Sequence, residues 1–251
     1  MKLSIVLPAI RTKNWKALYE SAVTSLGKYS EDFEMIMVGP YPPEDQFPDN
    51  FKWIQDWGAP ARCAQKGVEQ AQGKYLMWAS DDGVFLGNAL ETALDLRDTL
   101  DRKDIVVIRY AEGGNSPRPE YWSAPPHADL RLPGIPTHYK IAPVGMYDTD
   151  YFQEIGGWDC RYEHLNMCCH DLAFRVQNDG GKVHLSPDEV LSCTWDVHCA
   201  EWQPVGAAYR ENDAPLFAEI YNKPHNPDKV VIFWSNWQDS PERWVRRFGN
   251  E

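Results

Sequence analysis

Two adjacent carboxylates, Asp81 and Asp82, directly follow an apolar run at residues 75–79 and its Ser80. Large or apolar residues without polar alternation predict a strand that is buried on both faces, as in a mainly parallel sheet. Residues after such a strand lie at the carboxyl edge of the sheet, where open α/β sheets bind ligands. Carboxylate oxygens suit Mg²⁺ or Mn²⁺ that holds a substrate phosphate. The pair therefore predicts a divalent cation site, although aspartate and glycine are also ordinary turn residues.

The composition excludes several classes of protein. Of the 251 residues, 43% are hydrophobic and 13% aromatic, which excludes a disordered chain and provides for a substantial core. The net charge of −12 argues against a nucleic-acid partner, which needs clustered lysine and arginine. No apolar run reaches the roughly 18–20 residues that span a bilayer. Without a signal-peptide cleavage site near the start, we expect a cytoplasmic protein whose six cysteines are reduced.

The first part of the chain alternates between predicted strands and predicted helices. Short apolar runs predict strands at residues 3–7, 33–38, 51–54, 75–79 and 104–109. Helices are predicted at residues 13–26 and 61–71, and again after Asn88, which would form a capping box with Glu91. This alternation predicts an α/β fold.

The second part of the chain is less regular. Residues 112–143 hold seven prolines and three glycines, which predicts a long loop, and long ordered loops in compact domains are usually functional. Beyond it we expect a strand at residues 144–147, a short helix within 151–159, a helix that opens at His170 and Asp171, and a strand at 182–185.

Four motifs follow one another along the chain, namely the strand at residues 4–8, the segment 66–76 leading into Ser80-Asp81-Asp82, the segment 152–159, and residues 170–175. In their order and separation they resemble the family 2 glycosyltransferases of GT-A fold. The resemblance covers roughly residues 1–185. It implies one GT-A-like domain over residues 1–222, with a nucleotide-binding half at about 1–110, an acceptor and catalytic half at about 111–222, and a C-terminal extension at 223–251 packed on the domain.

The resemblance implies an inverting glycosyltransferase that moves a sugar from a nucleotide diphosphate to an acceptor hydroxyl of a glycan or lipid-linked glycan. UDP is the default nucleotide, while dTDP and GDP stay open. Asp82 takes the position of the metal-binding aspartate, where Mn²⁺ or Mg²⁺ would stabilise the departing diphosphate. Asp171 takes the position of the general base that removes the acceptor proton. The donor-binding residues implied are Pro8, Ala9, Arg11, Gly39, Arg62, Gln65 and Asp81.

Several of these residues have other interpretations. Asp171 also suits the N-cap of a helix. His198 lies about where some relatives supply a further metal ligand, but a lone histidine is more often structural. Asp148 and Asp150 form a second Asp-x-Asp sequence, at a place where relatives have no metal site. Residues 241–248 form a short basic and aromatic segment that suits either a helix packed on the domain or peripheral contact with an anionic membrane.

Two other functions stay open. A degenerate relative would bind glycans or a partner protein without catalysis, and Asp82→Asn and Asp171→Asn would change nothing in it. A nucleotidyltransferase that builds the sugar nucleotide would favour a glycine- and lysine-rich loop after the first strand. The segment 8–12, Pro-Ala-Ile-Arg-Thr, is not such a loop.

Overall fold

The computed structural model describes residues 1–112, 129–130, 139–140, 142–193 and 206–221. The described part is built on one eight-stranded sheet with the order β3-β2-β1-β4-β9-β6-β10-β5. Its strands are β1 (Leu3–Pro8), β2 (Phe33–Gly39), β3 (Phe51–Gln55), β4 (Tyr75–Trp78), β5 (Gly83–Phe85), β6 (Ile105–Glu112), β9 (Gly145–Asp148) and β10 (Val183–Cys193). A separate antiparallel pair joins β7 (Asp129–Leu130) to β8 (Tyr139–Lys140).

The sheet is mainly parallel, as the apolar runs predicted. β1 pairs in parallel with β2 and β4, β2 with β3, and β6 with β10. β9 is antiparallel to both β4 and β6, and β5 is antiparallel to β10. The α/β fold expected from the sequence is therefore confirmed, and the second part of the chain contributes β9 and β10 to the same sheet as the first.

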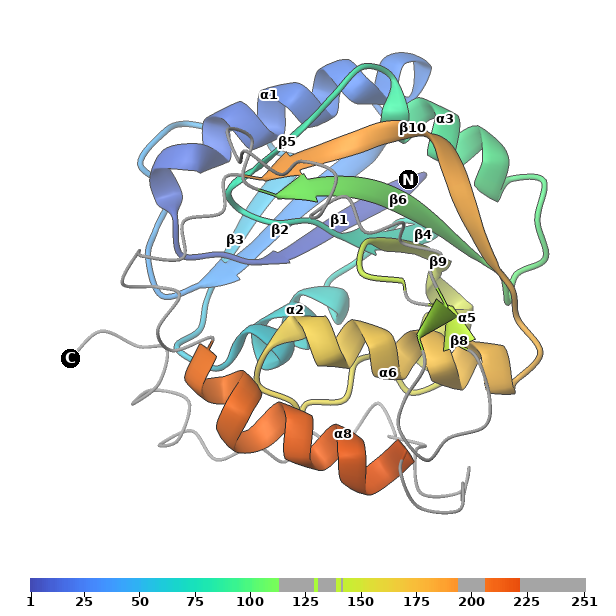
Figure 1. Cartoon of the computed structure of the whole chain (residues 1–251). Helices are drawn as coiled ribbons and strands as arrows, with labels where there is room; N and C mark the ends of the chain where they lie inside the picture. Colours follow the sequence, from blue (N-terminus) through green and yellow to red (C-terminus); the bar gives the residue numbers. More distant parts are fainter. Residues whose placement is uncertain (113–128, 131–138, 141, 194–205, 222–251) are drawn as a thin grey trace.

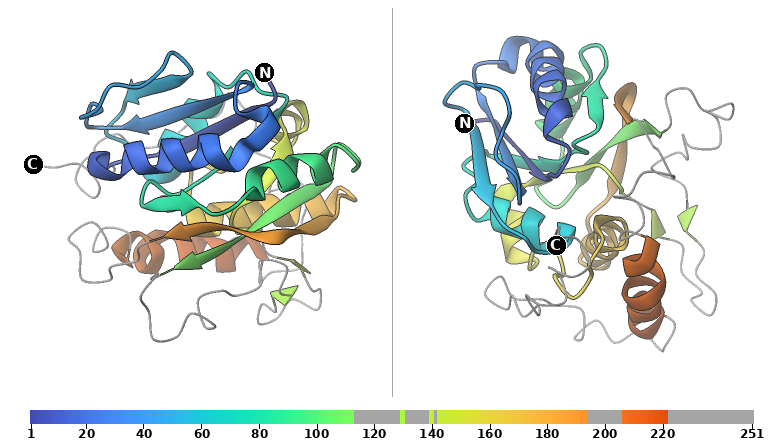
Figure 2. Two further views of the ribbon diagram at one scale, coloured as in Figure 1. Left: turned by 90° about the horizontal axis from the view of Figure 1, so that it is seen from above. Right: turned by 90° about the vertical axis from the view of Figure 1, so that its left-hand side faces the viewer.

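Helices cover both faces of the sheet (Figure 1), and Figure 2 shows α1 and α3 lying together across one face. The helices are α1 (Trp15–Leu26), α2 (Pro60–Val68), α3 (Ala89–Arg97), α5 (Thr149–Glu154), α6 (Leu165–Asn178) and α8 (Ala214–Tyr221). Residues that alternate along a strand point to opposite faces. Accordingly, Leu3 and Ile5 of β1 pack in the cluster with α1 and α3, whereas Val6 packs in the cluster with α2, α6 and α8.

Two expectations about local structure were wrong or incomplete, and one strand was not predicted. α6 begins at Leu165, with His164 as its N-cap, because residues 165–169 contain no helix breaker and bury Leu165, Cys168 and Cys169. β10 extends to Cys193, well past residue 185, because it pairs with β6 as far as Cys193 and, at Leu191–Cys193, also with β5. The short strand β5 had no clear sequence signal.

The predicted capping box at Asn88 is also wrong. α3 does begin after Asn88, but the Asn88 side chain makes no capping hydrogen bond. The carboxylate of Glu91 instead lies 3.5 Å from the ammonium of Lys28. It also lies over Gly27, where an added Cβ would be 1.9 Å from Glu91 Oε2. The Glu91 side chain, which the local pattern assigned to the cap, is therefore used in a tertiary contact.

Some expectations fall outside the described residues. These are most of the proline-rich loop, His198, the extension at 223–251 and the basic segment at 241–248. Among the residues that the structure does describe, none belongs to a helix with both the length and the apolarity needed to cross a bilayer. Five cysteines are buried free thiols, namely Cys63, Cys160, Cys168, Cys169 and Cys193.

Candidate functional site

Asp81 joins the turn after β4 to the loop after β1. Its Oδ2 accepts hydrogen bonds from the backbone N–H groups of Ile10 and Arg11, each at 2.7 Å. Its Oδ1 accepts a hydrogen bond from Nη1 of Arg11. Asp81 is only 4% exposed. Burial raises the pKa of the Asp81 carboxyl, while the charge of Arg11 and the two N–H donors oppose that rise.

Asp82 follows Asp81 in the same turn after β4. Its Oδ1 accepts a hydrogen bond from the hydroxyl of Ser80 and lies 3.4 Å from Nη1 of Arg11. The N–H of Gly83 donates to the carbonyl oxygen of Ser80 at 2.9 Å, which closes the turn before β5. The carboxyl edge of the sheet therefore presents two carboxylates and one guanidinium together.

A divalent cation fits this turn only in part. The donor set consists of hard carboxylate oxygens, which Mn²⁺ and Mg²⁺ prefer. Within the described residues, however, no three histidine, cysteine, aspartate or glutamate side chains converge on one point. Asp81 already accepts three hydrogen bonds, so Asp82 is the better placed ligand. A cation here would take its remaining ligands from water and from a bound diphosphate, which is the usual arrangement for Mg²⁺.

Three more of the expected donor-binding residues meet at this edge. Pro8 pairs with Val38 at the end of β1, and the N–H of Ala9 donates to the carbonyl of Val38 at 2.9 Å. Gly39 ends β2 beside Ala9, and a Cβ added to Gly39 would lie 1.8 Å from the carbonyl oxygen of Ala9. Glycine is therefore required for this close approach, and the structure brings Pro8, Ala9 and Gly39 to the loop that holds Asp81.

The sequence did not point to Asp56, which follows β3 at the same edge. This buried carboxylate accepts hydrogen bonds from the N–H of Gly58 at 2.6 Å and from Lys66, and it pairs with Arg62. Burial alone would raise its pKa, but the hydrogen bonds from Lys66 and Gly58 and the charge of Arg62 lower it. Arg62 is thus tied to Asp56 in this structure. The only sequence signal was an aspartate two positions after the strand predicted at residues 51–54.

An aromatic pair accompanies Asp56. The rings of Tyr41 and Trp57 meet edge to face, with centroids 5.8 Å apart. Trp57 is 37% exposed although most of the tryptophans that the structure describes are less exposed. The loop after β2 and the segment after β3 therefore present an aromatic surface next to a charged cluster.

Gln65 contacts the glycine turn that follows α5. It is buried in α2, and its Oε1 accepts a hydrogen bond from the backbone N–H of Trp158 at 2.9 Å. A Cβ on Gly157, whose φ is +67°, would lie 2.5 Å from the Gln65 side chain. Gln65 thus fixes the glycine turn between α5 and α6.

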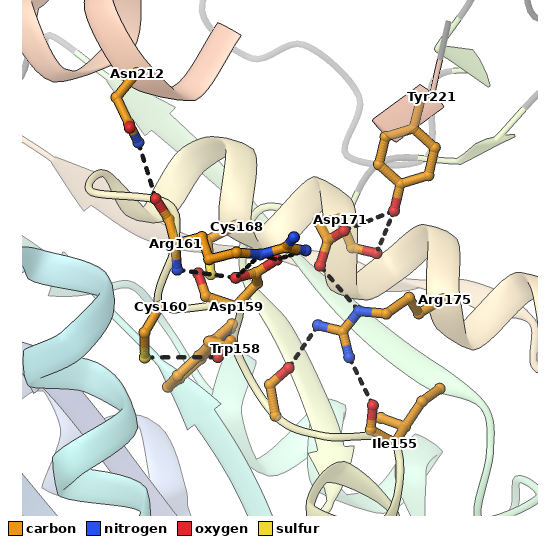
Figure 3. A network of polar contacts seen from close by, with 11 residues as sticks. Ile155, Trp158, Asp159, Cys160, Arg161, Cys168, Asp171, Arg175, Asn212 and Tyr221 are labelled. Carbon is orange, nitrogen blue, oxygen red and sulfur yellow. Dashed lines mark hydrogen bonds and ion pairs between the residues drawn. The ribbon is translucent and has the colours of Figure 1, made fainter. Parts of the chain in front are cut away.

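Asp171 lies inside α6 in a network of polar contacts (Figure 3). Its Oδ2 accepts a hydrogen bond from Nε of Arg175 at 2.9 Å, and its Oδ1 accepts one from the hydroxyl of Tyr221 at 2.7 Å. The residue is fully buried. Burial raises the pKa of the Asp171 carboxyl, and the charge of Arg175 opposes that rise. The helix N-cap interpretation of Asp171 is wrong, because α6 begins at Leu165.

Arg175 and Asp159 extend this network. Nη1 and Nη2 of Arg175 donate to the carbonyl oxygens of Ile155 and Gly157 at 2.7 Å and 2.5 Å. Asp159 is fully buried and pairs with Arg161, whose Nη2 lies 2.7 Å from Asp159 Oδ2. The network therefore ties α6 and α8 to the glycine turn. The second Asp-x-Asp sequence has a separate role, because Oδ1 of Asp148 accepts from the N–H of Tyr151 and caps α5.

We expect a loss of stability in acid from two histidines, His164 at the N-cap of α6 and His170 inside that helix. Burial lowers the pKa of His164 and of His170 to about 4, and Nδ1 of each has no hydrogen-bond partner among the described residues. An unfolded histidine has a pKa of about 6.5. Between these values the unfolded chain binds protons that the folded chain does not, so the free energy of unfolding falls as the pH is lowered through this window.

Urea unfolding at several values between about pH 7 and pH 4 checks this prediction. His170→Gln is expected to reduce the slope of stability against pH, since it removes one of the two groups. His184→Gln is the matched control, because His184 lies nearer the surface and pairs with Asp104 at 2.9 Å. Equal slopes for the unmodified chain and His170→Gln would contradict the prediction.

Comparison with solved structures decides the fold family. S. aureus TarS 1–349 in complex with UDP-GlcNAc matches with a TM-score of 0.60 at 17% identity, over 92% of this chain and 69% of that chain. The chain has a GT-A fold. GalNAc-T7 with UDP, GalNAc and Mn²⁺ shares the GT-A fold with a TM-score of 0.57 at 11% identity, over 78% of this chain and 44% of that chain.

A longer S. aureus TarS structure matches this GT-A fold with a TM-score of 0.57 at 16% identity. The alignment covers 92% of this chain but only 41% of that TarS chain. No protein-family model and no curated protein sequence matches the chain. At these identities the likeness establishes the GT-A fold and no more.

Proposed function

We propose that the chain is a glycosyltransferase that takes a sugar from a nucleotide-diphosphate donor, by default a UDP-sugar, and moves it with inversion to an acceptor hydroxyl. The observation that carries this proposal is the position of Asp81 and Asp82. They lie at the carboxyl edge of a GT-A sheet, joined to the loop after β1. Two neighbours of the same fold were solved with UDP-GlcNAc and with UDP and Mn²⁺.

The proposed reaction forms one bond and breaks another. The acceptor oxygen attacks the anomeric carbon of the donor, the bond from that carbon to the diphosphate breaks, and the acceptor proton passes to a base. Mn²⁺ or Mg²⁺ held by Asp82 would supply positive charge toward the leaving diphosphate. The loop of Pro8, Ala9 and Arg11, with Gly39 and Arg62, would bind the nucleotide. Asp81 would fix this loop and contact the donor.

Asp171 is the proposed general base. Its Oδ1 accepts a hydrogen bond from the hydroxyl of Tyr221, so this oxygen is already oriented toward a hydroxyl group. In the proposed complex the acceptor hydroxyl takes the place of the Tyr221 hydroxyl. Arg175 stays bound to Oδ2, and its charge opposes the rise in the Asp171 pKa that burial causes, which favours the ionised form that a proton acceptor needs. The acceptor is proposed to be a glycan or a lipid-linked glycan, reached from the cytoplasm.

A second candidate function has its own support. Asp171 is fully buried and holds two partners, an arrangement that also serves to stabilise α6 without any catalysis. A glycan- or partner-binding module with a GT-A fold would retain this network. It would not transfer sugar.

A thermal-shift panel of UDP, GDP, dTDP and CMP, each with and without Mn²⁺, tests the proposal. A ligand that binds only the folded state stabilises it by about 2.7 kcal/mol at a hundred times its dissociation constant. UDP is expected to raise Tm only when Mn²⁺ is present. If no nucleotide raises Tm with metal, the transferase proposal fails and the binding module replaces it. If GDP or dTDP raises Tm and UDP does not, that nucleotide replaces UDP as the proposed donor nucleotide.

A further inference from the structure

The guanidinium of Arg11 lies between the two carboxylates of the candidate metal motif. Its Nη1 donates to Oδ1 of Asp81 and lies 3.4 Å from Oδ1 of Asp82. The side chains of these aspartates are 5% and 9% exposed. Carboxylates that water reaches so poorly need a compensating positive charge, and Arg11 supplies one in this structure.

A divalent cation held by Asp82 would lie beside the Arg11 guanidinium. Nη1 of Arg11 is 3.4 Å from Oδ1 of Asp82, and the same nitrogen donates a hydrogen bond to Oδ1 of Asp81. Two positive groups at this separation repel each other. Arg11 in this position therefore opposes the binding of a cation to Asp82.

The loop after β1 has an anchor on Asp81 that does not depend on the Arg11 guanidinium. The Arg11 side chain is 33% exposed. The backbone N–H groups of Ile10 and Arg11 hold the other oxygen of Asp81, each at 2.7 Å, and these bonds do not involve the guanidinium. A guanidinium that turns outward from this loop is well suited to a diphosphate, because its planar fork can bind two phosphate oxygens.

We propose that Arg11 is a counter-ion that occupies the cation's place until the donor binds. The diphosphate brings its own oxygens as metal ligands and accepts the displaced guanidinium, so that cation and nucleotide bind together. This inference rests on the proposed function. It assigns Arg11 two successive partners, first the aspartates and then the diphosphate. Its consequence is that the cation alone binds weakly.

The test measures Mn²⁺ binding to the full chain without nucleotide, by the loss of the free Mn²⁺ electron paramagnetic resonance signal. Arg11→Met keeps an unbranched side chain and removes the charge. It is expected to bind Mn²⁺ at least about tenfold more tightly than the unmodified chain, because a repulsive charge has been removed. Arg11→Lys keeps the charge and is expected to bind Mn²⁺ as weakly as the unmodified chain.

Arg102→Met is the matched control, since it removes the same charge from an exposed pair with Glu154 before β6. Its Mn²⁺ affinity is expected to equal that of the unmodified chain. If Arg11→Met does not fold, Arg11→Gln takes its place. If Arg11→Met binds Mn²⁺ no more tightly than the unmodified chain does, the inference is overturned.

A second titration separates this inference from the proposed function. UDP is titrated in saturating Mn²⁺, where Arg11→Met is expected to bind UDP about tenfold more weakly than the unmodified chain, because a charged partner of the diphosphate is lost. UDP affinity that is equal in the two chains overturns the second role of Arg11. If the unmodified chain does not bind UDP at all, the proposed function fails, while the Mn²⁺ titration still decides whether Arg11 occupies the cation's place.

Discussion

Asp82→Asn is expected to abolish the Mn²⁺-dependent rise in Tm with UDP and to lower kcat/KM for sugar transfer by about a hundredfold to a thousandfold. Asparagine keeps the size of the side chain and an oxygen that can accept from the Ser80 hydroxyl, as Asp82 does. It removes the negative charge that a divalent cation needs. The loss should therefore fall on metal binding and on stabilisation of the leaving diphosphate, while the turn before β5 stays intact.

The measurement compares transfer rates and thermal shifts for the unmodified chain and two variants. Asp150→Asn is the matched control, because Asp150 belongs to the other Asp-x-Asp sequence and is exposed in the first turn of α5. It is expected to keep both transfer and the Mn²⁺-dependent shift. If Asp82→Asn transfers sugar as fast as the unmodified chain, the cation site is not at Asp82. If the unmodified chain transfers no sugar and neither substitution changes the thermal shift, the binding module explains the chain better than the transferase.

Arg175→Met is expected to lower the free energy of unfolding by about 3–5 kcal/mol. Arg175 is buried, and its guanidinium donates to Asp171, to Ile155 and to Gly157. Its removal leaves the fully buried carboxylate of Asp171 without its cation and leaves two carbonyl oxygens without these donors. Uncompensated buried charge is among the most destabilising changes that a single substitution can make.

Urea unfolding of the unmodified chain and of Arg175→Met measures this loss in the free energy of unfolding. Arg102→Met serves again as a control, since its pair with Glu154 is exposed and is expected to contribute less than about 1 kcal/mol. The double variant Asp171→Leu/Arg175→Met is expected to recover part of the loss, because it leaves no buried charge unpaired. A cost for Arg175→Met as small as that for Arg102→Met would show that the network does not stabilise α6.

The sequence contained enough local information to predict the sheet edge that carries Asp81 and Asp82. β1, β2 and β4 are short apolar runs with turn residues after them, and the position of a side chain at the end of a buried strand follows from that pattern alone. That Pro8, Ala9 and Gly39 lie close together follows for the same reason, because the neighbouring parallel strands β1 and β2 end at the same edge of the sheet.

Partners that lie far apart in the sequence could not be predicted in this way. Asp171 accepts from Tyr221 of α8, and Gln65 of α2 accepts from Trp158 after α5. Neither pair has a periodic signal, so a helix start was the natural local interpretation of Asp171, and the contact of Gln65 with Trp158 could not be foreseen. The misassigned cap at Asn88 has the same origin, because Glu91 pairs with Lys28 of a different segment.

The interleaved order of the sheet also limits when the chain can fold during synthesis. β9 stands between β4 and β6, and β5, directly after the aspartates, pairs with β10. A nascent fragment of residues 1–110 therefore has a gap between β4 and β6 until β9 has left the ribosome. Such distant pairings fold slowly, because long loops must close before their contacts form. We therefore expect that residues 1–110 do not fold on their own, and that their unpaired strand edges are exposed to aggregation during synthesis.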